Sequence, residues 1–219
     1  METTLIRLVC YVIDIIVCFL LVGYFIREYM IKKLRASLAW AVGFFLFSLM
    51  IISLASYTTI DTVSKIQVMV AFVLASSAVS SLYYGAALIY FGEKSFFREK
   101  MTSIFFVGII IIGSILTAVT DKSELVSTVG NYTNGIFLLV YVVIGSMFFA
   151  VSRKLPGGDP RKRAINMVGI AWYIVAIWNT YVGLFWGEDP LLEAGMFLLG
   201  SFGFLLLLYG MTTGKATRT

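Results

Sequence analysis

Seven long apolar stretches, separated by short polar segments, cover most of the chain. They span residues 4–26, 38–57, 66–91, 102–120, 132–152, 165–186 and 191–211. A helix of about twenty residues, rising about 1.5 Å per residue, crosses the ~30 Å hydrocarbon core of a bilayer. Helices are expected because a spanning segment must satisfy its own backbone hydrogen bonds, and runs such as Phe105–Leu116 lack the alternation of a barrel strand. The pattern predicts an all-α membrane protein, with seven transmembrane helices forming one domain over residues 1–219 and no soluble domain.

The basic residues lie almost entirely on one side of these stretches. Fourteen lysines and arginines follow the first, third, fifth and seventh stretches, whereas only Arg7, Lys65 and Lys122 fall on the other side. The positive-inside rule places the basic side in the cytoplasm. The sequence therefore predicts a multi-pass protein of the cell membrane, with its N-terminus outside and its C-terminus in the cytoplasm.

The basic loops suggest two kinds of partner. Lysine and arginine clusters beside a membrane attract anionic lipid headgroups, which we expect here in preference to nucleic acid. The loop from Arg153 to Arg163, with its Pro156-Gly157-Gly158 turn, is a candidate contact for a cytoplasmic signalling partner. Membrane lipids are the expected general partners, and the small residues of the third stretch permit a monomer or a homo-oligomer.

Residue types needed for common enzyme chemistry are missing from the sequence. The chain has no histidine, which removes a Ser-His-Asp triad, an imidazole general base and most zinc and haem sites. No glycine-rich nucleotide-binding motif occurs in a strand–helix context. We therefore expect no enzymatic activity, no metal and no cofactor.

Asp14 is the most informative single residue. It lies near the middle of the first stretch, where an ionised carboxylate costs about 2.5–3.5 kcal/mol on insertion scales. This cost predicts that Asp14 faces the interior and is bonded to a partner, or carries a proton. Arg7 lies two turns away on nearly the same face, at a distance that suits a water bridge between the two better than a direct bond. Asp14 can be a ligand or proton site, or a structural hydrogen-bond anchor.

Several polar and aromatic residues share the predicted outer half of the bundle with Asp14. Asn179 is the most prominent, because it lies about two turns inside the sixth stretch, beside Trp178. The candidate ligand-binding residues are Arg7, Asp14, Asn134, Trp172, Tyr173, Trp178, Asn179, Tyr181 and Glu193. Such a group can form an outward-opening cavity with aromatic sides and a few polar contacts. The alternative is an interfacial belt of aromatic residues with satisfied helix ends.

Two segments resemble microbial rhodopsins. The run Trp178-Asn-Thr-Tyr181-Val-Gly-Leu-Phe185 is similar to their sixth helix, in which a Trp-x-x-Tyr-Pro run followed by another aromatic residue lines the retinal pocket. Gly203-Phe204 and the leucines that follow look like the end of their seventh helix. The resemblance implies a rhodopsin-like arrangement of seven helices.

The same resemblance implies a protein without retinal. It places Ser201 where the family has its retinal-binding lysine, and no lysine occurs between Lys162 and Lys215. No Schiff base can therefore form in the sixth or seventh helix. Only the fold carries over, and a fold alone does not confer a function.

Three functions remain open from the sequence. The leading hypothesis is a non-photochemical sensor or receptor-like module that binds a small ligand, or senses the membrane state, from its outer half. The first alternative is a small-solute, proton or ion transporter that uses Asp14, and the second is a structural subunit of a membrane complex. The three prolines all lie in loops and no internal repeat is evident, which disfavours transport by an inverted-repeat mechanism.

Overall fold

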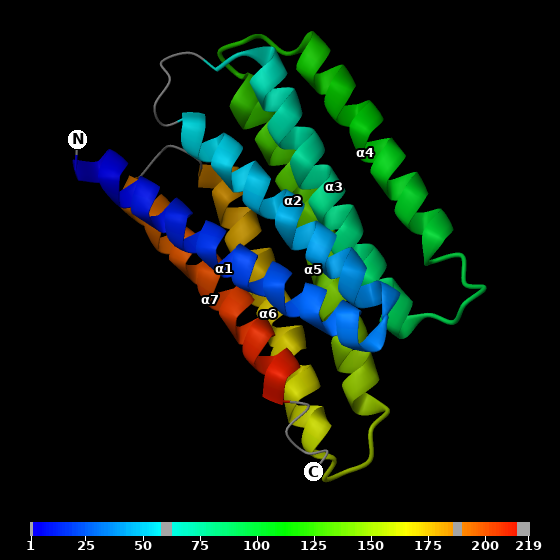
Figure 1. Ribbon diagram of the computed structural model, residues 1–219. Coiled ribbons are helices and arrows are strands. Elements are labelled where there is room, and N and C mark those ends of the chain that lie inside the picture. The colour runs from blue at the N-terminus through cyan, green and yellow to red at the C-terminus, as the bar shows by residue number, and fades with distance from the viewer. Residues whose placement is uncertain (1, 58–62, 186–189, 214–219) are drawn as a thin grey trace.

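The protein is all-helical over the residues that the structure describes (Figure 1). The computed structural model describes residues 2–57, 63–185 and 190–213, and its side chains over residues 5–57, 63–181 and 191–213. Seven helices are present: α1 (Glu2–Lys32), α2 (Arg35–Tyr57), α3 (Lys65–Tyr90), α4 (Glu99–Val119), α5 (Leu125–Arg153), α6 (Pro160–Phe185) and α7 (Pro190–Thr213). The predicted helical fold class is confirmed.

Several helices are longer than the apolar stretches that predict them. α1 continues to Lys32, beyond residue 26, and α5 begins at Leu125, before residue 132. Polar residues at a helix end still form i to i−4 backbone hydrogen bonds. The helical backbone therefore extends past the ends of the apolar run.

Six of the described helices are long and apolar enough to cross a membrane, namely α1 to α5 and α7. The length of α6, 26 residues, is also sufficient, but polar and aromatic residues such as Asn166, Tyr173 and Asn179 lower its mean hydropathy. Long apolar helices of this kind indicate a membrane-embedded protein.

Six helices form a closed ring, and α4 packs outside it. Neighbours in the ring follow the order α1, α2, α3, α5, α6 and α7, and α7 returns to α1 (Figure 1). α4 packs on the outside, against α3 and α5. Of its described residues only Ile109, Gly113 and Thr117 are buried, so most of α4 is left exposed for contact with lipid.

The interior of the ring is filled by aromatic side chains. The centroid of the Phe204 phenyl group on α7 lies 5.4 Å from those of both Phe44 and Phe47 on α2. Trp172 on α6 stacks on Phe44 at 6.4 Å, and Trp178 lies 5.7 Å from Phe47. Edge-to-face and offset-stacked pairs of this kind add to the stabilisation from apolar burial.

Close contact between α2 and α3 depends on a glycine. A Cβ atom at Gly85 would lie 1.9 Å from Cδ1 of Trp40. The indole lies across this glycine, where its Nε1 donates a 3.0 Å hydrogen bond to the carbonyl oxygen of Leu82. Small residues at helix contacts permit this kind of close approach in membrane proteins.

The helix order separates the two ends of the bundle. The α1–α2, α3–α4 and α5–α6 connections and the end of α7 lie at one end, which we call the basic end (Figure 1). There Asp159 caps α6, because its Oδ1 accepts a 2.9 Å hydrogen bond from the backbone N–H of Arg161. Pro160 begins the helix, a position where proline costs no hydrogen bond. Arg7, Lys65 and Lys122 lie toward the opposite end.

Candidate functional site

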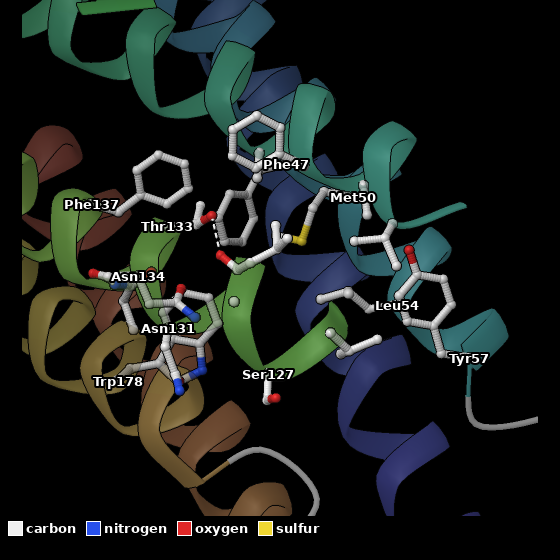
Figure 2. Close-up of a pocket in the computed structure, with 18 of the residues that line it drawn as sticks. Phe47, Met50, Leu54, Tyr57, Ser127, Asn131, Thr133, Asn134, Phe137 and Trp178 are labelled. Carbon is white, nitrogen blue, oxygen red and sulfur yellow. Dashed lines mark hydrogen bonds between the residues drawn. The ribbon is translucent and has the colours of Figure 1, made fainter. Parts of the chain in front are cut away.

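A cavity of about 310 Å³ lies in the half of the bundle away from the basic end (Figure 2). It is enclosed by the second half of α2, the first halves of α3 and α5, and single turns of α6 and α7. Most of its lining is apolar, for example Phe47, Met50, Leu54, Phe72 and Phe137. A small, mainly apolar cavity with a few polar groups is typical of a small-molecule site.

Three of the predicted ligand-binding residues line this cavity, namely Asn134, Trp178 and Asn179. The side-chain amide of Asn179 donates a 2.8 Å hydrogen bond from Nδ2 to the backbone oxygen of Asn134. This bond joins α6 to α5. In Figure 2 the labelled Asn131, Asn134 and Trp178 gather on one side of the cavity, and Met50, Leu54 and Tyr57 lie on the other.

Other polar groups of the lining are already paired. Thr133 donates from Oγ1 to the carbonyl oxygen of Val129 at 2.5 Å, within α5. Tyr57 donates from its hydroxyl to the carbonyl oxygen of Gln67 at 2.7 Å, joining α2 to α3. Each hydroxyl group already uses its single proton in these hydrogen bonds, so neither can donate to a ligand.

Two donors in the lining lack an acceptor. The hydroxyl of Tyr141 and the indole Nε1–H of Trp178 are buried and have no hydrogen-bond partner among the described residues. Their side chains are 1% and 4% exposed. Because a buried donor without an acceptor is costly, these two groups favour a ligand that carries a hydrogen-bond acceptor.

Three further candidates on α6 do not line the cavity. Trp172 is fully buried and stacks on Tyr141 with ring centroids 5.8 Å apart. Tyr173 is half-buried, and its hydroxyl lies 2.9 Å from that of Ser146 on α5. Tyr181 is also half-buried and is not among the described lining residues. Trp172 supports the cavity through Tyr141, whereas Tyr173 belongs to the α5–α6 contact.

The remaining candidates form a separate polar contact between α1 and α7. Asp14 is fully buried there and accepts a hydrogen bond from the hydroxyl of Ser201. Glu193, 3% exposed, accepts a 2.7 Å hydrogen bond from the Tyr11 hydroxyl and forms a 2.8 Å ion pair with Arg7. Asp14 thus has the inward position and bonded partner expected from the cost of its burial.

This arrangement adds one partner that the sequence did not name and corrects one expectation. Arg7 pairs directly with Glu193, because α7 brings that carboxylate close to the guanidinium. The nine candidate residues do not surround one site, because the cavity is lined by α2, α3, α5, α6 and α7, and its described lining does not include Arg7, Asp14 or Glu193. They divide between the cavity, the α5–α6 contact and the α1–α7 contact.

The sequence did not single out most of the lining. Phe47, Met50, Phe72, Phe137 and Tyr141 carry no motif that distinguishes them from ordinary core residues. Gly130 carried no usable signal either, because a glycine inside an apolar membrane helix usually indicates close helix packing. No atom lies within 4 Å of a Cβ built on Gly130, which lines the cavity.

Among the described residues, no group of three or more histidine, cysteine, aspartate or glutamate side chains is placed to hold a metal ion. Comparisons with protein-family models, with curated proteins and with solved structures gave no match.

Proposed function

We propose that the protein is an integral membrane sensor that binds a small, mainly apolar molecule carrying a hydrogen-bond acceptor. It would span the cell membrane seven times, with α6 as a span, its N-terminus outside and its basic end in the cytoplasm. The ligand would then enter the outer half of the bundle. One observation carries this proposal: the cavity of about 310 Å³ is lined by two buried donors, Tyr141 and Trp178, without acceptors.

The chemistry of the cavity limits the class of ligand. Its phenyl, alkyl and thioether side chains favour an apolar body, and no described lysine, arginine, aspartate or glutamate lines it. The Tyr141 hydroxyl and the Trp178 indole would donate to a carbonyl, ether or hydroxyl oxygen. A strongly charged molecule would lack a counter-charge and is disfavoured.

The aromatic interior supplies a physical connection from the cavity to the basic end. Phe47 lines the cavity and contacts Phe204, which contacts Phe44. Phe44 in turn stacks on Phe25 at 5.9 Å, close to the basic end. Close-packed interiors transmit small displacements. In this proposal, ligand occupancy changes the packing of these rings and thereby the basic loops, which contact a signalling partner.

A pair of glycine variants on α5 tests ligand binding. Gly130→Phe adds a ring at a lining position where a Cβ meets no atom within 4 Å, whereas Gly135→Phe adds the same ring at an exposed position that does not line the cavity. Native mass spectrometry of gently purified wild type and both variants measures what each retains. We expect one defined small molecule on the wild type and on Gly135→Phe, and its loss from Gly130→Phe.

The contrary result is equally clear. Heterogeneous lipid on all three proteins, with no defined small molecule, would exclude an occupied ligand site. Retention of a stoichiometric protein would instead favour the complex-subunit alternative. Flux of the identified molecule in proteoliposomes would favour transport over sensing.

A further inference from the structure

A second cavity, of about 640 Å³, lies at the basic end of the bundle. The final turns of α1, α3 and α7 and the first turns of α2 and α6 enclose it, together with Arg98 between α3 and α4. Its apolar sides include Phe25, Trp40 and Phe148. The basic side chains of its lining are Lys32, Lys33, Arg35, Arg98 and Arg161, and the acidic ones are Glu28 and Glu93.

Three of the five cations have carboxylate partners, and the longest of these contacts is that of Arg98 with Glu99, at 3.5 Å. Lys32 pairs with Glu28 at 2.8 Å, and Arg161 pairs with Asp159 at 2.7 Å. Lys33 instead lies over the ring of Tyr29, with Nζ 5.6 Å from the centroid. Glu93 is exposed and forms no ion pair among the described residues. Positive charge therefore remains in excess. Lys33 and Arg35 carry it, and Arg98 adds to it because its contact with the half-exposed Glu99 is long.

Arg98 is the most buried of the basic residues that line this cavity. Its side chain is 9% exposed, and its Nε has no hydrogen-bond partner among the described residues. The carboxylate paired with it, that of Glu99, lies 3.5 Å away and is itself 49% exposed. A buried guanidinium with incomplete pairing favours an anion, and its planar geometry suits two oxygens of a phosphate.

The backbone holds Arg98 in place. Its carbonyl oxygen accepts a 2.7 Å hydrogen bond from Thr102 Oγ1, and its N–H donates to Ser95. The hydroxyl of Tyr83 on α3 donates to the carbonyl oxygen of Phe97 at 3.0 Å. The arginine therefore projects from a turn anchored to both α3 and α4.

Arg35 is linked to Arg98 through two shared residues. Arg35 donates from Nη2 to the Tyr84 hydroxyl at 3.3 Å, and this hydroxyl donates to Glu99 Oε1 at 3.2 Å. The same oxygen pairs with Arg98, so the Glu99 carboxylate contacts the guanidinium of Arg98 directly and that of Arg35 through the Tyr84 hydroxyl. Arg35 also begins α2, whose first residues line the cavity, and the N-terminus of a helix attracts anions.

We propose that this cavity binds a phosphate-bearing anion, held by Arg98 and Arg35 with Lys33 as a further positive charge. The phosphate can belong to an anionic lipid headgroup or to a soluble phosphate compound. This site is separate from the apolar cavity at the other end of the bundle, and the proposal does not rest on the ligand proposed there.

The test uses the full chain, delipidated in a zwitterionic detergent and titrated in native mass spectrometry. The probes are phosphatidylglycerol, inorganic pyrophosphate and, for comparison, zwitterionic phosphatidylcholine. The variants are Arg98→Gln and Arg35→Gln. Arg153→Gln is the control, because it removes an exposed charge at the same end without altering the described lining.

We expect saturable binding of phosphatidylglycerol or pyrophosphate to the wild type and to Arg153→Gln. Either site variant weakens it about tenfold or more, as the loss of a charge-assisted hydrogen bond implies. Saturation by phosphatidylglycerol alone assigns the phosphate to a lipid, and saturation by pyrophosphate alone assigns it to a soluble compound.

Arg35→Gln decides the outcome if Arg98→Gln does not fold, because Arg35 is exposed and outside the packed core. Equal binding by Arg35→Gln and Arg153→Gln overturns the proposal. Equal affinity for phosphatidylcholine and phosphatidylglycerol, or no saturable binding of either anion, also overturns it.

Discussion

The guanidinium of Arg7 and the carboxylate of Glu193 lie 2.8 Å apart and join the first helix to the last. Glu193 is 3% exposed in its side chain and also accepts the hydroxyl of Tyr11, whereas Arg7 is 21% exposed. The carboxylate therefore depends more on this contact than the guanidinium does. This ion pair closes the helix ring at the end opposite the basic loops.

The asymmetry of this pair predicts an asymmetric mutational response. Arg7→Met leaves a buried carboxylate without its counter-charge and is expected to destabilise the protein by about 1–3 kcal/mol. Glu193→Gln costs less, because the amide oxygen still accepts the Tyr11 hydroxyl. Equilibrium unfolding in mixed detergent micelles measures the free energy of unfolding of both variants. The double variant should lose less stability than the sum of the two single losses. Equal losses in the single variants would contradict this account.

A second prediction concerns Asp14 and Ser201. Ser201→Ala removes the described hydrogen-bond partner of a fully buried carboxyl group and should cost about 1–3 kcal/mol. Asp14→Asn keeps an acceptor for the serine hydroxyl and should be less destabilising. Because Asp14 does not line the apolar cavity, Asp14→Asn should also retain the small molecule seen on the wild type in native mass spectrometry. Loss of that molecule would contradict this prediction and indicate that Asp14 belongs to the ligand site.

A third prediction concerns the α2–α3 contact. Gly85→Ala should destabilise the protein by about 1–3 kcal/mol, the usual range for overpacking, because the new methyl group displaces the Trp40 indole from its position over the glycine. Gly108→Ala on α4 is the control, since no atom lies within 4 Å of its Cβ position. That change should be neutral or stabilising by up to about 1 kcal/mol, because alanine is the better helix former. The free energy of unfolding in mixed detergent micelles compares Gly85→Ala with Gly108→Ala.

A fourth prediction concerns the start of α6. The pKa of Asp159 is lowered, first by its side-chain hydrogen bond to Arg161 and then by the backbone N–H of the same residue. The stabilisation is therefore present above the ordinary pKa of an aspartate and is lost as the pH falls through the lowered value. Asp159→Ala removes both cap and ion pair, whereas Asp159→Asn keeps an amide cap. Trypsin should therefore cleave after Arg161 or Lys162 fastest in Asp159→Ala, and amide hydrogen exchange at Arg161 in the wild type should accelerate on acidification.

A fifth prediction tests the proposed orientation. The native cysteines are buried, Cys10 at 4% exposure and Cys18 at 0%, so they provide a low background for thiol labelling. In intact cells, a membrane-impermeant maleimide should label Ser123→Cys in the α4–α5 connection. Gly157→Cys, in the α5–α6 connection, should react only after the membrane is permeabilised. The reverse pattern would place the basic end outside.

The sequence by itself determined that the protein is helical and that its basic residues lie mostly at one end of the bundle. Apolar stretches of about twenty residues require helices, because backbone polar groups cannot remain unpaired in hydrocarbon. The lysines and arginines of alternate connections had to gather at one end once short loops made neighbouring helices antiparallel. The burial of Asp14 also followed from the cost of a carboxylate among apolar residues.

The partners of these residues were decided only by the tertiary structure. Depth can be counted along a helix, but the rotation of a helix and its neighbours in the ring depend on how all seven surfaces pack together. Asp14 and Asn179 therefore share a half of the bundle and yet lie in different contacts, with Ser201 and Asn134 respectively. The cavity likewise arises from side chains on five helices that leave space between them, and no local pattern records that space.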